Sequence, residues 1–268
     1  MLAAPAGASV FGPRAAHSPN ADHIRTAYWV AIIVGAILIV TVHAFLIAAV
    51  VRFRARRGRS PRRFTAGARA FWRPAAPLVA VAVGLFVFAI VMTTKTREVA
   101  GPGPQALAAD GDLVAQVNGL SIPPNSKPLN INVIGQRWLW RFEYPGGRPG
   151  DRIFSYGELT VPVDTPILLH LTSTDVTHRW FVPALGGQVD ALPGQEAGTW
   201  FEADEPGTYH GQSTSFSGTS YATMRAWVHV VTPQAYQQFI KGKRQQLARA
   251  QDYVARRLQE TTPVGPMP

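Results

Sequence analysis

The chain has 268 residues, a formal net charge of +10 and no cysteine. Without a thiol it can form no disulfide, iron–sulfur cluster, cysteine-ligated zinc site or copper–thiolate site, and it has no cysteine nucleophile. Charged residues make up only 16% of the chain, below the ~25% of ordinary soluble domains, while 47% of it is hydrophobic. This balance predicts a chain that is partly membrane-embedded and partly globular.

The first part of the chain predicts a leader followed by a membrane anchor. Residues 1–25 are expected to form a short irregular leader, because no charged stretch precedes a separate apolar core as in a cleaved signal peptide. Uncharged apolar runs then extend from Thr26 to Val51 and from Pro74 to Thr94. Each run reaches the ~20 residues that a helix needs to cross the hydrocarbon core. Residues 26–98 are therefore predicted to form a two-helix transmembrane hairpin.

The excess positive charge lies between the two apolar runs. Nine arginines and no acidic residue occur from Arg52 to Arg73, and without them 17 basic residues stand against 16 acidic ones. A short arginine-rich loop between two spans stays in the cytoplasm, where it meets anionic lipid headgroups. We therefore expect a two-pass protein with both chain ends on the outer side of the membrane, and no nucleic-acid partner.

Within the spans, His43 is the only residue of a type whose ordinary pKa lies near neutral pH. Ionisable groups inside a membrane are candidates for function. A lone histidine near a helix end more often hydrogen-bonds a neighbouring helix or subunit, so His43 is predicted to be an intramembrane polar contact.

Residues 99–231 predict an outer domain made of strands. A linker rich in Gly, Pro and Ala, residues 99–129, precedes short β-type runs that are separated by turn residues. This spacing favours an antiparallel sandwich or barrel. Residues 232–268 predict a C-terminal helix, loosely amphipathic from Pro233 to Glu260, and a tail. Six or more strands are expected, among them Leu129–Ile134, Arg137–Tyr144, Glu158–Val163, Pro166–Thr172, Gly198–Ala203 and Met224–Val231.

Three ordered motifs lie within and beside these strands. The first reads GQRWLWRFEY from Gly135, the second reads DVTHRWFVP from Asp175 and continues to DALPG from Asp190, and the third reads EPGTYHGQ from Glu205. Together with the two-helix anchor, they resemble subunit II of the haem–copper respiratory oxidases, whose motifs read G-x-Q-W-x-W-x-x-x-Y and D-V-x-H-x-x-x-V-P. The resemblance covers about residues 25 to 231. It implies a cupredoxin-like Greek-key β-sandwich on a transmembrane hairpin.

The loop after the third motif departs from the copper-bearing members of this family. Their loop reads G-Q-C-x-E-x-C-G-x-x-H-x-x-M and, with an earlier histidine, holds a binuclear copper A centre bridged by two thiolates. A serine hydroxyl is a very poor ligand for such a centre, so the resemblance implies that this chain binds no metal. We expect the residues at these positions to pack and hydrogen-bond in a loop that keeps its shape, in preference to forming a weak metal site. The six positions are His178 and Met224, which match the pattern, and Ser213, Ser215, Ser217 and Tyr221, which do not.

The resemblance also implies a function. Members without copper A oxidise membrane quinol, reduce oxygen to water and translocate protons, with the haems, the remaining copper and the quinol site in subunit I. This chain would then be a non-catalytic subunit of an oxidoreductase in the bacterial plasma membrane, bound to subunit I, subunit III and lipid. Trp138 matches the electron-entry tryptophan of the family and would be vestigial. The alternatives are a partner of another haem–copper core, such as a nitric oxide reductase or a divergent cytochrome c oxidase, and a stand-alone membrane-tethered module.

Overall fold

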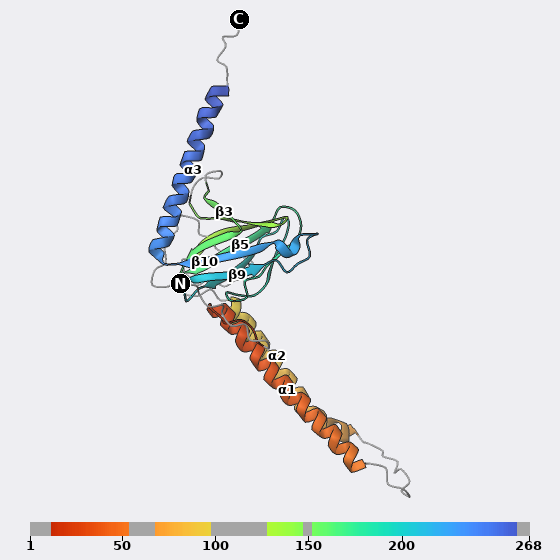
Figure 1. Ribbon diagram of the computed structural model, residues 1–268. Helices are drawn as coiled ribbons and strands as arrows, with labels where there is room; N and C mark the ends of the chain where they lie inside the picture. The colour runs from red at the N-terminus through yellow and green to blue at the C-terminus, as the bar shows by residue number, and fades with distance from the viewer. Residues whose placement is uncertain (1–11, 54–67, 98–127, 147–151, 262–268) are drawn as a thin grey trace. The chain divides into compact units, whose positions relative to one another are not determined.

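The computed structural model describes residues 12–53, 68–97, 128–146 and 152–261, and it divides into two compact units (Figure 1). One unit comprises residues 23–95, which hold most of the two long N-terminal helices. The other comprises residues 1–22 and 96–268, which hold the strands and the third helix. Most of the arginine-rich loop and most of the predicted linker lie outside the described residues.

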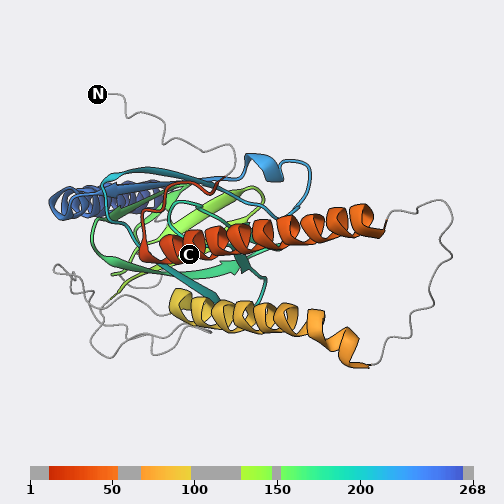
Figure 2. The ribbon, with the colours of Figure 1, turned by 90° about the horizontal axis from the view of Figure 1, so that it is seen from below.

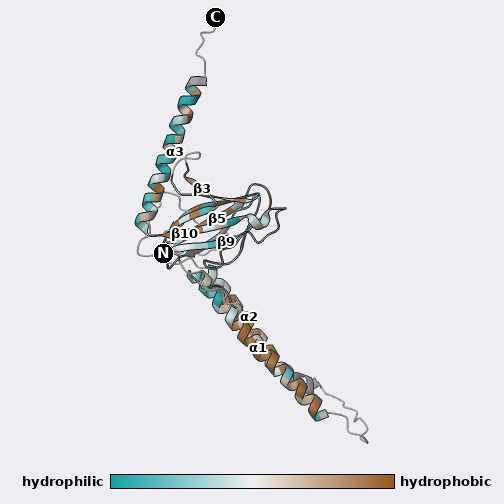
Figure 3. Cartoon of the chain, in the orientation of Figure 1, coloured by the Kyte–Doolittle hydropathy of each residue, from teal (hydrophilic) through white to brown (hydrophobic). Residues whose placement is uncertain are grey.

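The helical unit contains α1 (Pro19–Phe53) and α2 (Ala68–Arg97), which Figure 2 shows as two separate rods. The stretches Pro19–Arg52 of α1 and Ala76–Arg97 of α2 are long and apolar enough to cross a membrane. Their apolar side chains point outward, and Val40 and Phe45 are 67% and 72% exposed, so both helices are predominantly hydrophobic in Figure 3. Such a surface is stable only against lipid or another apolar partner. The predicted membrane anchor is confirmed.

The outer domain contains two main sheets and a small hairpin. The larger sheet has the order β3-β2-β1-β5-β8, the smaller has the order β4-β10-β9, and β6 pairs with β7. All six predicted strands are present, within three residues of the expected bounds at every end. The strands are β1 (Leu129–Gln136), β2 (Leu139–Glu143), β3 (Phe154–Tyr156), β4 (Glu158–Pro162), β5 (Pro166–Ser173), β6 (His178–Trp180), β7 (Val189–Ala191), β8 (Ala197–Glu202), β9 (Gly207–Gln212) and β10 (Arg225–Val231).

The prediction of purely antiparallel pairing is wrong at two places. Strand β1 pairs in parallel with β5, from Leu129 opposite Ile167 to Gly135 opposite Ser173, and β10 pairs in parallel with β4. Parallel neighbours cannot be joined by a tight turn, so they are contributed by distant parts of the chain. The result is a mixed sandwich that belongs to the predicted class, a cupredoxin-like domain on a two-helix anchor with a C-terminal helix.

The core of this domain lies between the sheets. Strand β1 alternates buried and half-buried residues, as expected for a strand with one face inward, whereas β5 is buried along almost its whole length. Trp180 packs edge-on against Trp140 and Phe142, with ring centroids 5.4 and 5.8 Å apart. Each such aromatic pair contributes about 0.5–1.5 kcal/mol beyond the burial of apolar area. This aromatic cluster holds β6 against β2.

The C-terminal helix α3 (Pro233–Thr261) is attached to the domain by its first turns. The Thr232 hydroxyl accepts a hydrogen bond from Ala235 N, as an N-cap residue does. Tyr236 is buried, and Phe239 packs edge-on against Tyr144 at 5.4 Å. Farther along, Tyr253, Val254 and Leu258 are exposed.

Candidate functional site

The candidate site lies where the loop between β9 and β10 returns beside β6. Because β9 and β10 are antiparallel neighbours, the two ends of this loop are close, and Ser213 N donates to Met224 O at 2.9 Å. The loop is also fastened to β6, since Arg179 N donates to Ser213 Oγ at 3.2 Å and Thr214 N donates to Arg179 O at 3.4 Å. A short 3₁₀ helix, η1 (Tyr221–Thr223), precedes β10. The loop therefore has a defined conformation set by the sandwich.

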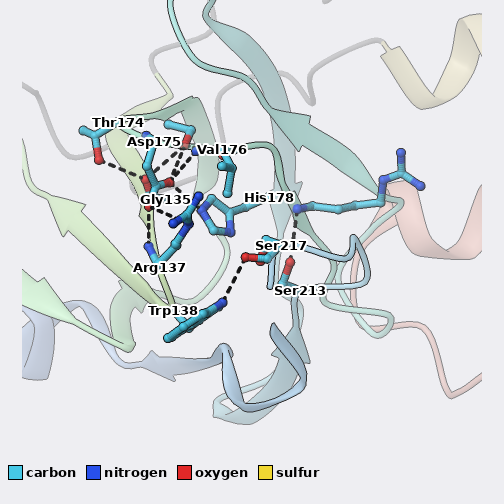
Figure 4. A network of polar contacts seen from close by, with 11 residues as sticks. Gly135, Arg137, Trp138, Thr174, Asp175, Val176, His178, Ser213 and Ser217 are labelled. Atoms are coloured by element: carbon cyan, nitrogen blue, oxygen red, sulfur yellow. Dashed lines mark hydrogen bonds and ion pairs between the residues drawn. The ribbon is translucent and has the colours of Figure 1, made fainter. Parts of the chain in front are cut away.

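His178 is the first residue of β6, and its side chain is fully buried. Its Nε2 lies 2.9 Å from Asp175 Oδ1, and the same carboxylate accepts hydrogen bonds from Arg137 N at 2.8 Å and Val176 N at 2.6 Å (Figure 4). Partial burial of Asp175 favours its neutral form. The hydrogen bonds from His178, Val176 and Arg137 outweigh this effect and hold the pKa of Asp175 at about 2. The carboxylate is therefore ionised at neutral pH.

The ionised Asp175 determines which nitrogen of His178 carries a proton. A carboxylate can only accept, so His178 Nε2–H must be the donor and, in the neutral ring, Nδ1 holds a lone pair. That Nδ1 is buried and has no hydrogen-bond partner among the described residues. Gly135 of β1 allows the close packing here, because a Cβ at this position would lie 2.9 Å from His178 Cδ2.

Three of the other predicted positions are buried in the same loop. Ser213, Ser217 and Met224 are 2%, 7% and 0% exposed. Figure 4 shows His178, Ser213 and Ser217 gathered at the base of the loop. The hydroxyl of Ser217 has no hydrogen-bond partner among the described residues, whereas Ser213 accepts from Arg179 N. The site thus contains an unpaired imidazole nitrogen and an unpaired hydroxyl.

The other two predicted positions are only half-buried. Tyr221 is half-buried and packs edge-on against Phe216, with ring centroids 5.3 Å apart, and Phe216 is 78% exposed. Ser215 is also half-buried, and no side-chain hydrogen bond joins it to the rest of the described structure. The tyrosine ring is therefore directed to the outer surface of the loop.

Trp138 lies in the turn between β1 and β2 and leans on the same loop. Its Nε1–H donates to Ser217 O at 3.2 Å (Figure 4), and a Cβ on Gly218 would come within 3.1 Å of its ring. Gly218 has a φ of +113°, which few other residues adopt. Trp138 also lines a surface hollow of about 450 Å³ with Arg137 and Phe216. Trp138 thus packs against the loop and is partly accessible to solvent.

His43 lies apart from this site, in α1. Its Nδ1 is 2.7 Å from Ile39 O, one helical turn earlier. This local hydrogen bond satisfies one ring nitrogen within the helix itself, where no water is available. A role for His43 in contact with another helix stays a prediction.

Asp175 stands at the start of the second motif, but no role was predicted for it. The structure makes Asp175 the centre of the network, because it joins the turn after β1, the start of β6 and the Ser173 hydroxyl, which lies 3.2 Å from its Oδ1. The signal that could have revealed it is the D-x-x-H spacing, which places a carboxylate within reach of an imidazole in a turn.

The outer domain matches known proteins. Residues 152–231 match the family described as cytochrome c oxidase subunit II, periplasmic domain. The chain is 27% identical over 274 aligned positions to cytochrome c oxidase subunit 2 of Cereibacter sphaeroides, covering 89% of this chain and 81% of that protein. It is 35% identical over 106 positions to ubiquinol oxidase subunit 2 of Acetobacter aceti, covering 40% of this chain and 33% of that protein.

Another relative and a solved structure give a similar result. Cytochrome bo(3) ubiquinol oxidase subunit 2 of Buchnera aphidicola is 35% identical over 104 positions, covering 39% of this chain and 35% of that protein. The matches to both ubiquinol oxidase subunits therefore span about a third of those proteins. The crystal structure of the periplasmic domain of subunit II of cytochrome oxidase of Bradyrhizobium japonicum superposes with a TM-score of 0.42 at 26% identity, over 44% of this chain and 95% of that one.

The fold and the matches define a class of protein, a membrane-anchored subunit with an exported β-sandwich domain. The comparisons support a haem–copper oxidase subunit II, because the matched family covers residues 152–231 and the relatives are subunit 2 proteins of cytochrome c and ubiquinol oxidases.

Proposed function

We propose that this chain is the subunit II of a quinol-oxidising haem–copper terminal oxidase and that it has no copper A centre. The observation that carries the proposal is the pair of serines, Ser213 and Ser217, at both positions where copper-bearing members have bridging cysteines. The chain contains no cysteine that could replace them. Two of the relatives are ubiquinol oxidase subunits, which supports the same donor class.

The residues present do not fit a binuclear copper centre. Such a centre needs soft thiolates to share an electron between two coppers, and a neutral serine hydroxyl is a hard oxygen donor. Ser213 Oγ already accepts a hydrogen bond from Arg179 N. Tyr221, which stands at the position of a histidine ligand in the family pattern, packs against Phe216 and has no imidazole nitrogen to bind copper. His178 and Met224 remain as a nitrogen and a thioether, which are too few ligands for tight binding.

The role of the chain follows from what the loop still does. Asp175, His178 and Trp138 hydrogen-bond the loop and the strands into one packed end of the sandwich. None of these side chains carries a redox group. Without copper A, Trp138 would have no metal centre from which to receive or to which to pass electrons. The chain is then a structural subunit that braces subunit I, which carries the haems and one copper, beside subunit III. The arginine-rich loop would face the cytoplasm, with the sandwich on the outer side of the bacterial plasma membrane.

A second candidate is a divergent cytochrome c oxidase that receives its electrons through another subunit. Two observations favour it. A match that covers 89% of this chain is to a cytochrome c oxidase subunit. His178 also keeps the identity and burial that a copper ligand would need. In this case copper would have been lost from a copper-bearing ancestor.

The test is to purify the complex through an affinity tag on this chain and to measure oxygen uptake with reduced quinol and with reduced cytochrome c. We expect uptake with quinol alone, and one copper for each pair of haems by elemental analysis. Uptake with cytochrome c alone would refute the quinol assignment and support the second candidate. Reduction of nitric oxide in place of oxygen would identify another haem–copper core. A chain that purifies without haem would be a stand-alone module.

A further inference from the structure

We propose that a basic cleft in the outer domain binds an oxyanion of the phosphate class, either the headgroup of a phospholipid or free phosphate. The cleft has a volume of about 370 Å³ and is lined by residues from the leader, from the segment after β6 and from strands β9 and β10. Binding of such an anion is independent of the electron donor proposed above. The side chains that shape the cleft are Arg14, Phe181, Pro183, His210, Arg225 and Trp227.

The charge of the cleft is uncompensated. Arg14 and Arg225 are exposed, and neither forms a salt bridge or a side-chain hydrogen bond within the described part of the chain. Other arginines of the same domain are engaged, since Arg141 pairs with a glutamate at 2.8 Å and Arg179 pairs with an aspartate through two nitrogens. No acidic residue lines the cleft. Two guanidinium groups therefore face a concave space without a counter-charge.

The pKa of His210 also indicates that the cleft is positively charged. The pKa of His210 is lowered, first by partial burial and then by the positive charges of Arg14 and His229. A negative ligand beside these groups would oppose the two charge effects and raise the pKa of His210. The cleft is thus a place where a bound anion is stabilised by charges that otherwise repel one another.

The strands hold these side chains on one face. Arg225 lies opposite Gln212, and Trp227 lies opposite His210, in the antiparallel pairing of β10 with β9. Residues two apart on a strand point to the same side, so Arg225 and Trp227 share a face with His210. The rings of His210 and Trp227 are 4.0 Å apart between centroids. This face is therefore a rigid wall of one cation, one imidazole and one indole.

The rest of the cleft is formed by the segment after β6 and by the leader, and both are held in place by backbone contacts. Gln212 N donates to Phe181 O at 3.1 Å, and a Cβ on Gly211 would overlap that same carbonyl, so β9 and the segment after β6 are in direct contact. The leader is held by His17, whose N donates to Ala184 O at 2.8 Å and whose O accepts from Asp204 N at 3.2 Å. Arg14 is three residues from this attachment. The cleft is built from docked segments and exists before any ligand enters.

The chemistry of the cleft favours phosphate. A guanidinium group is a planar donor that matches two phosphate oxygens at once, and charge-assisted hydrogen bonds of this kind are about twice as strong as neutral ones. The aromatic wall can cover the carbon side of a headgroup. Arg14 also lies five residues before Pro19, where the first span begins, a distance of at most about 18 Å along an extended chain. A headgroup at the outer surface of the membrane is therefore within reach of this arginine.

The experiment compares the tagged complex with a double variant, Arg14→Gln and Arg225→Gln. A matched control, Lys241→Gln and Arg249→Gln, removes the same charge from exposed positions of α3. Each complex is reconstituted in nanodiscs of phosphatidylcholine with or without phosphatidylglycerol, and retained lipid is measured by native mass spectrometry. Binding of inorganic phosphate to the complex in detergent is measured by calorimetry. Thermal unfolding of all three complexes checks that the substitutions leave the fold intact.

The two arms distinguish the source of the ligand. We expect the cleft variant to lose about tenfold in affinity or retention while the control is unchanged, as for the loss of charge-assisted contacts. Retention of phosphatidylglycerol would identify a lipid site, and phosphate binding without lipid retention would identify a site for the free ion. Equal binding by the cleft variant and the parent complex would overturn the proposal, as would the absence of both ligands from the parent complex.

Discussion

Among the exposed carboxylates of the outer domain, Asp175 should cause the largest loss of folding stability when it is removed. We expect Asp175→Ala to destabilise the domain, because it leaves the buried His178 Nε2–H and the N–H groups of Arg137 and Val176 without their acceptor. The pKa of this carboxyl falls from 3.8 to about 2 on folding. At 1.36 kcal/mol per pKa unit this corresponds to at most about 2.4 kcal/mol. The side chain is 29% exposed, so solvent screening reduces the expected loss to about 1–2 kcal/mol.

The assay is thermal unfolding of the full chain in detergent, followed by the near-ultraviolet circular dichroism of the Trp140 and Trp180 pair. A loss of this size lowers the Tm of a domain of ~100 residues by roughly 5–10 °C. Asp252→Ala is the control, because its carboxylate pairs with Arg256 on the exposed part of α3 and should change Tm by less than about 2 °C.

The pH dependence gives the decisive result. The folded-state pKa of Asp175 is lowered, so its stabilisation is complete above the unfolded value near 4 and is lost as pH falls toward 2. The difference in Tm between the parent protein and Asp175→Ala should therefore be constant from pH 7 to 5 and shrink between pH 4 and 2. A difference that is independent of pH, or equal to that of the control, would refute the assignment of Asp175 as the ionised centre of the network.

Three further predictions concern the loop and its support. Gly211→Ala should lower the free energy of unfolding by about 1–3 kcal/mol in denaturant titrations, since its Cβ would overlap Phe181 O. Trp138→Phe should leave quinol-driven oxygen uptake within about twofold of the parent complex, a barrier change below 0.5 kcal/mol, if the indole only supports the loop. A variant with the family's ligand pattern should bind a pair of copper ions, which would give a visible absorption band when copper is added. Its substitutions are Ser213→Cys, Ser215→Glu, Ser217→Cys and Tyr221→His.

Each of these three predictions has a control variant or a result that would contradict it. Gly207→Ala lies on the same strand, where a new Cβ would be no closer than 3.8 Å to any neighbour, and should be tolerated. A large loss of uptake in Trp138→Phe would show that electrons pass through the tryptophan. The four-site variant is compared with one that also carries His178→Ala, and copper binding by both would show that the loop does not keep the ligand geometry.

The sequence predicted most elements of the fold because their signals are local. Two uncharged runs of membrane-spanning length and short β-type runs between turn residues can be recognised without knowing the partners. The three-residue strands β3, β6 and β7 were not named, since so short a segment carries no periodic pattern, and the six-residue strand β9 was not named either. The parallel pairing of β1 with β5 was also missed. It depends on which distant strands meet in the sandwich, and the two faces of β5 are equally buried.

The candidate site was only partly accessible to sequence reasoning. The positions of His178, Ser213 and Ser217 came from a family pattern, and the structure buries all three, His178 at the start of β6 and the two serines in the loop between β9 and β10. The network around Asp175 depends on backbone N–H groups, which every residue except proline has and which no sequence pattern distinguishes. The basic cleft joins Arg14 to Arg225 across almost the whole chain, and only the docking of the leader brings them together.

The attachment of the leader also sets an order of assembly. Ser18 Oγ donates to Leu185 O, a contact between residues 167 positions apart in the chain. The leader is made first, but its binding surface exists only after the strands up to β9 have been synthesised and exported. Closure of such a long loop is late and slow compared with formation of local contacts. His17 and Ser18 are therefore among the last of the described residues to reach their final place, and they attach to the outer domain only once the strands that bind them are in position.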